Sequence, residues 1–214
     1  MEKMKIIIPA RKGSKGLPHK NRILLEHTIK KIPQKYIDNV IITTDDEYII
    51  DKLKDKYNVL VRDKELSGDT ASIKGVLENV IEEYNIDKNE EIIMLYLTYP
   101  ERMWDNVEKA LDFYRKQGAK SLLCQKELKI HPYLCLIEET GNRGKQIIKH
   151  DLYRRQDYPK CFEISHYICI FESSEIKFLN KNMYNNNTIF YPISDCIDVD
   201  TKGDLEKYND TNHS

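Results

Sequence analysis

The sequence predicts an α/β fold with a mainly parallel central sheet. Two observations favour this class: short apolar runs recur along the first part of the chain, and stretches with helical spacing of apolar residues lie between them. Strands that alternate with helices form parallel crossover units, and the sheet that they build is covered on both faces. Ligands of such sheets bind beyond the carboxyl ends of the strands.

Four apolar runs are expected as central strands, namely residues 5–10 (KIIIPA), 39–46 (NVIITTDD), 58–63 (NVLVRD) and 91–98 (EIIMLYLT). Helices are expected between or after them, over residues 46–57, 72–84 and 103–118. In the second helix the apolar side chains recur at three- and four-residue spacing and the acidic residues fall on the other face. Gly118 is a typical helix-ending residue.

The alternation of strand and helix patterns ends at about residue 127, where the segments become shorter and turn-forming residues more frequent. Apolar strands return at residues 167–173 (YICIFES) and 188–193 (TIFYPI). We therefore expect one α/β domain made of residues 1–126 and 167–214, interrupted by a small inserted lobe over residues 127–166.

Composition restricts the class of protein. A chain of 214 residues with 40% hydrophobic content can bury one core with a small appendage. Lys and Arg (34) nearly cancel Asp and Glu (35), which argues against a nucleic-acid partner. No run approaches the roughly 18 apolar residues that span a bilayer, and MEKMKIII is too short for a signal peptide, so we expect no membrane partner and a cytoplasmic location. The five scattered cysteines include no CxxC motif and suggest neither disulfides nor zinc.

A flexible basic loop follows the first expected strand in IIIPARKGSKGLPHKN, residues 6–21. Its glycines allow backbone N–H groups to face a phosphate, while four cations supply countercharge: Arg11, Lys12, Lys15 and Lys20. The loop matches neither the Walker A pattern nor GxGxxG. A solvated basic loop is the alternative interpretation.

Two further segments favour an anion site over a solvated loop. Arg62, Asp69, Thr70 and Ser72 crowd the start of the helix over 72–84, although capping that helix needs only one of them. In CIDVDTKGDL, Asp198 and Asp200 alternate at the expected end of a strand, so both carboxylates can point to one side. Paired carboxylates suit Mg²⁺, with a solvated acidic turn as the alternative. A cationic loop and an acidic pair together suit a metal–nucleoside triphosphate.

The chain resembles the acylneuraminate cytidylyltransferases, the CMP-sialic acid synthetase family. The resemblance rests on six segments in order: IIIPARKGSKGLPHKN, IITTDDEYI, RDKELSGDTAS, HPY, RRQDYP and IDVDTKGDL. It implies a Rossmann-like nucleotidyltransferase fold, a homodimer formed through the inserted lobe, and CTP with Mg²⁺. It also implies a reaction in which a sugar hydroxyl displaces pyrophosphate from the α-phosphorus of CTP.

Roles follow by position from this resemblance. Arg11 and Lys15 are expected to hold the triphosphate and Lys20 to add charge, so these three are the predicted catalytic residues. The predicted CTP contacts are Arg11, Asn21, Arg62 and Ser72, and the predicted Mg²⁺ ligands are Asp198 and Asp200. The predicted contacts to a small acidic sugar are Tyr96, Arg102, Arg155 and Ser165.

Departures from the family pattern gather on the sugar side. YLTYPER replaces the usual QPTSPLR, which puts Tyr96 in place of a glutamine that contacts the sugar but keeps Arg102. Further changes lie at Leu134, Ser165, His166 and Cys169, while Arg155 matches a family arginine suited to a carboxylate. We expect a 3-deoxy-2-ulosonic acid acceptor that is more deoxygenated than N-acetylneuraminic acid or differently substituted. A different class of acceptor, or a non-catalytic nucleotide-binding relative, are the alternatives.

Overall fold

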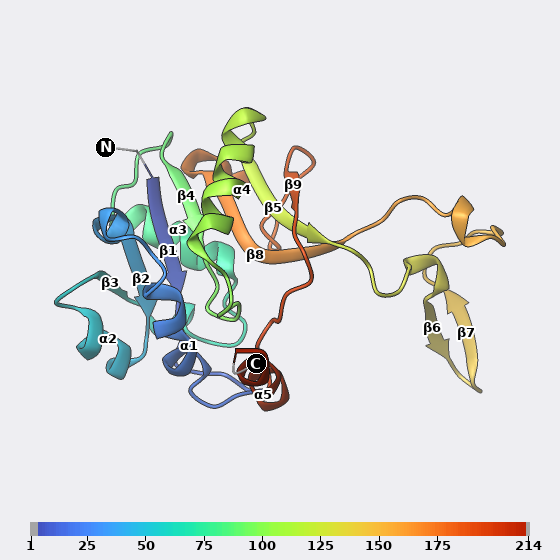
Figure 1. Ribbon diagram of the computed structural model, residues 1–214, viewed down its shortest axis with the longest axis horizontal. Coiled ribbons are helices and arrows are strands. Elements are labelled where there is room, and N and C mark those ends of the chain that lie inside the picture. Colours follow the sequence, from blue (N-terminus) through green and yellow to red (C-terminus); the bar gives the residue numbers. More distant parts are fainter. Residues whose placement is uncertain (1–3, 213–214) are drawn as a thin grey trace.

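The computed structural model describes residues 4–212 and shows a seven-stranded sheet from which a slender lobe extends (Figure 1). The strands lie in the order β3-β2-β1-β4-β8-β5-β9. Their bounds are β1 Met4–Pro9, β2 Val40–Thr44, β3 Asn58–Val61, β4 Glu91–Met94, β5 Ser121–Lys126, β8 Glu163–Glu172 and β9 Ile189–Pro192. The expected α/β class is confirmed, and each expected apolar run contains a strand.

The sheet is mostly parallel, with one strand reversed. β1 pairs in parallel with both β2 and β4, β2 with β3, and β5 with β9. β8 runs antiparallel to β4 and β5 because the chain returns along it from the lobe. The carboxyl ends of β1, β2, β3 and β4 therefore meet at one edge of the sheet.

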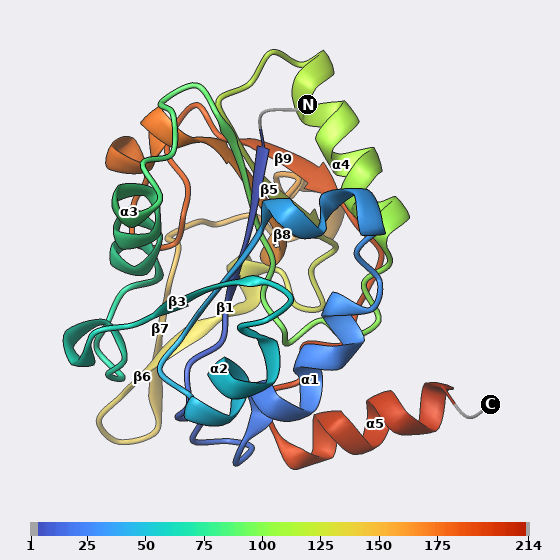
Figure 2. The ribbon, with the colours of Figure 1, turned by 90° about the vertical axis from the view of Figure 1, so that its left-hand side faces the viewer.

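Helices cover both faces of the sheet (Figure 2). Their bounds are α1 Lys20–Ile29, α2 Glu47–Leu53, α3 Ile73–Glu83, α4 Trp104–Lys116 and α5 Lys202–Asn212, with 3₁₀ turns η1 Gln34–Asn39, η2 Lys64–Leu66, η3 Pro132–Leu134, η4 Arg155–Asp157 and η5 Ser173–Phe178. Helix α3 and turn η5 pack on one face, and α1 and α4 pack on the other. The expected end of α4 is confirmed, since Gly118 follows it at a left-handed φ of 59°.

The alternation along β1 explains how one strand serves two cores. Met4, Ile6 and Ile8 pack toward α1 and α4, whereas Ile7 packs toward α3. All are fully buried, as expected for a central strand with both faces covered.

Some expected elements end earlier than the sequence suggests, and one is absent. β4 stops at Met94 rather than at residue 98, because the ladder to β8 ends with the Met94–Cys169 pair and the chain then turns away. Helix α2 stops at Leu53 rather than at residue 57. The strand expected to carry Asp198 and Asp200 is absent, since residues 193–200 form no strand.

The lobe lies between the end of β5 at Lys126 and the start of β8 at Glu163. Residues 163–165 pair with β5, so this part of the expected lobe belongs to the sheet. The lobe carries a hairpin of β6 Leu136–Glu139 and β7 Arg143–Gln146, and every residue of both strands is exposed. Its own small core consists of rings, with Tyr133 stacked on His150 at 4.2 Å between centroids.

Across residues 4–212, none of the helices combines the length and the apolar composition that crossing a membrane requires.

Candidate active site

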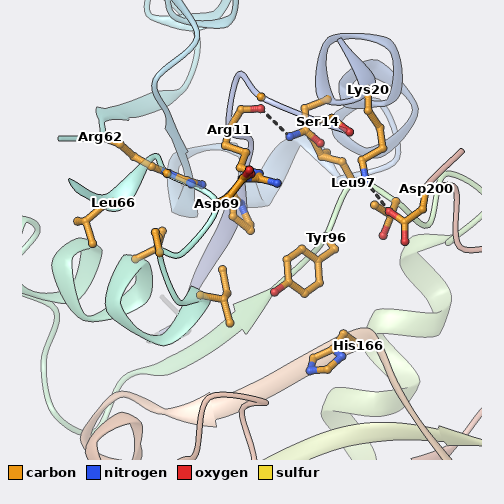
Figure 3. A pocket seen from close by; sticks show the side chains of 18 of the residues that line it. Arg11, Ser14, Lys20, Arg62, Leu66, Asp69, Tyr96, Leu97, His166 and Asp200 are labelled. Atoms are coloured by element: carbon orange, nitrogen blue, oxygen red, sulfur yellow. Dashed lines mark hydrogen bonds and ion pairs between the residues drawn. The ribbon is translucent and has the colours of Figure 1, made fainter. Parts of the chain in front are cut away.

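A pocket of about 430 Å³ opens beyond the carboxyl ends of β1, β3 and β4 (Figure 3). Its wall comes from the basic loop after β1, the start of α1, the segment between β3 and α3, the segment after β4, and strand β8. The predicted site residues that line it are Arg11, Lys20, Asn21, Arg62, Tyr96, Asp198 and Asp200. The pocket therefore gathers predicted residues from distant parts of the sequence.

The basic loop is bridged to the segment before α3 by one carboxylate. Arg11 Nη1 lies 2.7 Å from Asp69 Oδ1, and Lys15 Nζ lies 2.7 Å from Asp69 Oδ2. Hydrogen bonds from Lys15 and then Arg11 hold the pKa of Asp69 below its ordinary value. Arg11 and Asp69 line the pocket, whereas Lys15 is highly exposed and reaches the site only through Asp69.

The loop is also fixed to the end of β2. The backbone N–H of Lys12 donates to Asp45 Oδ1 at 2.7 Å, and Asn21 Nδ2 donates to the carbonyl oxygen of Arg11 at 2.8 Å. Asn21 thus links the start of α1 to the residue that follows β1 and holds Arg11 at the pocket.

A bidentate ion pair anchors the first turn of α1 beneath the loop. Arg22 Nε and Nη2 donate to Asp46 Oδ2 and Oδ1 at 2.7 and 2.8 Å, and Asp46 also caps α2 by accepting from Tyr48 N. Burial raises the pKa of Asp46, but the hydrogen bonds from Arg22 and Tyr48 outweigh it and the net pKa is lowered. The pair locks α1 to α2 and so holds Lys20 and Asn21 in place.

The acidic pair lies beside the basic loop, at the end of the loop that carries Gly16 and Lys20. Lys20 Nζ lies 2.5 Å from Asp200 Oδ1, and the hydroxyl of Tyr99 donates to Asp198 Oδ2 at 2.8 Å. No strand carries these carboxylates. Buried Val199 between them donates its N–H to Thr98 O at 2.8 Å, and this contact holds the segment against the end of β4.

Arg62 lies at the pocket end of β3 and is largely buried (Figure 3). Its Nε donates to Thr43 Oγ1 at 3.0 Å and its Nη2 to Thr43 O at 2.9 Å. Burial lowers the pKa of the guanidinium to about 10, a value at which it still carries a positive charge near neutrality. These bonds fix the guanidinium of Arg62, which follows the edge strand β3, at the wall of the pocket.

The remaining wall is aromatic and aliphatic. Tyr96 meets His166 edge-on, with ring centroids 5.9 Å apart, and burial raises the pKa of its phenol. Leu66, Ile73 and Val76 complete this side of the pocket. His166 and Tyr99 are pocket residues that the predicted site does not include, although both lie in segments that the sequence associates with the sugar.

Three predicted site residues have structural contacts and do not line this pocket. Ser72 Oγ caps α3 by accepting from Gly75 N at 3.1 Å, which is the ordinary capping role. Arg102 is buried and donates to Tyr167 O at 2.6 Å and to Tyr96 O at 2.8 Å. Ser165 is buried on β8, where its Oγ accepts from Tyr167 N at 3.3 Å.

Other predicted sugar-side positions lie farther away. Arg155 and Leu134 belong to the lobe, and of the described residues between 127 and 162 none lines the pocket. Cys169 is buried in the core beneath α3. The lobe projects away from the body of the protein (Figure 1). Arg155 is not among the residues that line the pocket of its own chain.

Comparison with known proteins places these features in a family context. A family model described as Cytidylyltransferase matches residues 5–100. The N-acylneuraminate cytidylyltransferase of Streptococcus agalactiae is 29% identical over 212 residues, which cover 93% of this chain and 51% of that protein. The chain thus spans about half the length of that relative.

Two further comparisons cover most of both partners. The pseudaminic acid cytidylyltransferase of Campylobacter jejuni is 31% identical over 169 residues, 73% of this chain and 72% of that protein. A solved structure of CMP:2-keto-3-deoxy-manno-octonic acid synthetase complexed with CTP has a TM-score of 0.71 at 16% identity and covers 99% of each chain. The likeness to that structure shows a shared fold.

Proposed function

Since this chain belongs to the acylneuraminate cytidylyltransferase family, we propose that it joins CTP to a 3-deoxy-2-ulosonic acid and forms a CMP-sugar and pyrophosphate. The observation that carries the proposal is the convergence of the cationic loop and the Asp198–Asp200 pair on one pocket. This arrangement offers positive charge to a triphosphate and, beside it, hard oxygen ligands to a cation.

The proposed reaction needs positioning and charge neutralisation. The sugar hydroxyl oxygen bonds to the α-phosphorus, the bond from that phosphorus to the bridging oxygen breaks, and pyrophosphate leaves while the hydroxyl proton passes to solvent. Arg11, Lys15 and Lys20 neutralise the phosphates, and Asn21 and Arg62 contact the cytidine. No covalent enzyme intermediate is required.

We also propose Mg²⁺ as the cofactor, with Asp198 and Asp200 as its protein ligands. Tyr99 engages one oxygen of Asp198 and Lys20 one oxygen of Asp200, which fixes both carboxylates at the pocket. Among residues 4–212 no group of three or more His, Cys, Asp or Glu is placed to hold a metal. A cation with two protein carboxylates completes its shell with water and phosphate oxygens, as Mg²⁺ commonly does. Held by these two carboxylates, Mg²⁺ would supply positive charge to the phosphates and would lower the pKa of a hydroxyl near it.

The acceptor subsite is proposed to lie against Tyr96 and His166. The neighbouring side chains Leu66, Ile73 and Val76 add apolar surface, so this wall offers few fixed hydrogen bonds to sugar hydroxyls. We therefore propose a preference for a more deoxygenated ulosonic acid, such as legionaminic or pseudaminic acid, over N-acetylneuraminic acid. Ser165 and Cys169 do not line the pocket, so this preference rests on Tyr96 and the apolar wall.

The acceptor proposal is tested by comparing kcat/KM for N-acetylneuraminic, legionaminic, pseudaminic and 3-deoxy-manno-octulosonic acids. Apolar pockets reject an extra hydroxyl only weakly, by roughly 100-fold, and we expect N-acetylneuraminic acid to fall below the best acid by up to that factor. Tyr96→Gln is expected to reduce the difference in kcat/KM between N-acetylneuraminic acid and the best acid. A wild-type preference for N-acetylneuraminic acid contradicts the proposed acceptor.

A homodimer formed through the lobe is part of the proposed function. Apolar side chains are exposed along the lobe: Ile130, Leu134, Leu136, Ile137, Ile147, Ile148, Leu152, Tyr153 and Phe162. Arg155 can meet a substrate carboxylate only in another copy, because its own pocket lies in the body. Mixing inactive Asp200→Asn and Arg155→Ala subunits should restore activity in mixed dimers. A monomer in light scattering, or no restoration from mixed dimers, contradicts this arrangement.

The function itself is tested by pyrophosphate release from CTP, ATP, GTP and UTP with Mg²⁺ and the four acids. We expect release from CTP alone, and only when an acid is present. Binding of CTP without release with any acid favours a different acceptor. The absence of both CTP binding and pyrophosphate release would refute the proposed activity.

A further inference from the structure

Asp69 holds the two cations of the basic loop that the proposed function assigns to the triphosphate. Each of its carboxylate oxygens has one partner at 2.7 Å, Arg11 for Oδ1 and Lys15 for Oδ2. Asp69 also lines the pocket, and Figure 3 shows its carboxylate beside Arg11 at the pocket wall. An anion of the chain thus occupies the position next to these cations where an anionic substrate is expected.

The start of α3 does not depend on this carboxylate. Helix α3 is capped by Ser72, whose Oγ accepts from Gly75 N, so the cap is supplied three residues further along the chain. The Asp69 side chain is half exposed, at 50%, and its burial contributes little to the core. The contacts of the Asp69 carboxylate with Arg11 and Lys15 are therefore those of a counter-ion to the loop.

A second anion cannot share these cations without cost. The triphosphate brings several negative charges, and like charges within a few ångströms repel each other. The triphosphate of CTP is therefore expected to replace the carboxylate of Asp69 in its ion pairs with Arg11 and Lys15. Because these pairs are exposed, the cost of breaking them is modest and the exchange is reversible.

Resting on the proposed function, we propose that Asp69 is an affinity-determining residue, an internal counter-ion that the triphosphate of CTP displaces from Arg11 and Lys15. The same exchange applies in reverse to pyrophosphate, since Asp69 can recapture the two cations when the product leaves. Asp69 thereby weakens the binding of both CTP and pyrophosphate and favours product release.

The test measures the dissociation constants of CTP and of inorganic pyrophosphate by calorimetry at constant ionic strength. Asp69→Asn keeps the side-chain size and removes the charge. We expect it to bind both ligands about 3- to 10-fold more tightly, in line with the loss of two exposed ion pairs. The matched control is Glu65→Gln in η2, which makes the same charge change in the same segment and is expected to alter either constant by less than about 2-fold.

A double-mutant cycle locates the effect. In an Arg11→Ala background, Asp69→Asn is expected to tighten the binding of CTP and pyrophosphate much less, because one of the competing ion pairs is already absent. Melting temperatures of all variants establish that they are folded, and pyrophosphate inhibition of turnover, which is expected to strengthen in Asp69→Asn, provides a second readout.

Unchanged or weaker binding by Asp69→Asn, with normal CTP binding by the wild type, overturns this proposal alone and makes Asp69 a residue that positions Arg11. An equal gain in Glu65→Gln overturns it in favour of a general charge effect. Failure of the wild-type protein to bind CTP refutes the proposed function, and this proposal with it.

Discussion

Gly16 of the basic loop packs directly on the main chain of Asp200. A Cβ atom placed on Gly16 would lie 2.4 Å from the carbonyl oxygen of Asp200 and 3.3 Å from its carbonyl carbon. Only a residue without a side chain permits this approach. The contact brings the loop and the acidic segment together, so the two charged halves of the pocket are positioned by one glycine.

Gly16→Ala is therefore expected to separate the loop from Asp200. The added methyl meets backbone, which cannot move aside as a flexible side chain can, so we expect a loss of about 1–3 kcal/mol in the free energy of unfolding and a clear loss of turnover. Gly13→Ala is the matched control in the same loop, since a Cβ there meets no atom within 4 Å. Urea denaturation and pyrophosphate release check both variants. Equal effects of the two substitutions contradict the proposed role of the contact.

Asp198→Asn and Asp200→Asn are each expected to abolish turnover while the protein stays folded. Each substitution removes a negative charge from the proposed Mg²⁺ site with little change of volume. Turnover at increasing Mg²⁺ concentrations and melting temperature are the measurements. Asp112→Asn, on the exposed side of α4, serves as the control. Normal Mg²⁺-dependent turnover in both site variants would remove the pair from the mechanism.

Arg102→Ala is expected to lower stability, by about 3 kcal/mol. The buried guanidinium donates hydrogen bonds to the carbonyl oxygens of Tyr167 and Tyr96. The substitution removes both donors and leaves a cavity in their place. Chemical denaturation measures the loss, and Arg143→Ala on the exposed β7 is the control. A sugar-binding role predicts the opposite pattern, in which KM for the acid rises and the free energy of unfolding is unchanged.

Mild acid is expected to loosen the docking of α5 on α1. His27 Nδ1 lies 3.2 Å from the hydroxyl of Tyr208, and burial, followed by the charges of Lys31 and Lys30, lowers the pKa of His27 against a small opposing effect of Glu26. The unfolded chain binds the proton more readily, with a pKa near 6.5, so the contribution of His27 to stability is complete above about pH 6.5 and is lost as the pH falls below it.

Melting temperatures between about pH 7.5 and 5.5 check this expectation. The wild type should lose stability toward the acid end, and His27→Gln should show a smaller loss over the same range. Parallel pH profiles of the two proteins would show that another group causes the acid sensitivity.

The sequence predicts the parallel half of the sheet well because period and composition are local signals. The run around Ile6–Ile8 is apolar on both faces, and α3 has a clear apolar stripe, so both follow from residues close in sequence. Helix α1 also has a detectable signal, since Leu24, Leu25, Thr28 and Ile29 recur at helical spacing and are buried. Helix α1 is nevertheless not among the predicted helices.

Long-range features are not encoded in such local patterns. The reversal of β8 depends on how the chain returns from the lobe, and the position of Asp198 and Asp200 depends on packing of Val199 against the end of β4. Arg102 illustrates the limit for single residues, because an arginine in a sugar motif and an arginine buried on backbone carbonyls have the same local sequence. The motif predicts which segment lies near the site, and tertiary packing decides the role of each residue in it.

Product analysis tests the central claim, cytidylyl transfer to an acidic sugar, most directly. The protein is incubated with CTP, Mg²⁺ and each ulosonic acid carrying a heavy-oxygen label in its anomeric hydroxyl, and the products are identified by phosphorus NMR and mass spectrometry. The account predicts a CMP-sugar that retains the label in its phosphoester bond, together with unlabelled pyrophosphate. Formation of CMP without a sugar adduct, or appearance of the label in pyrophosphate, would contradict it.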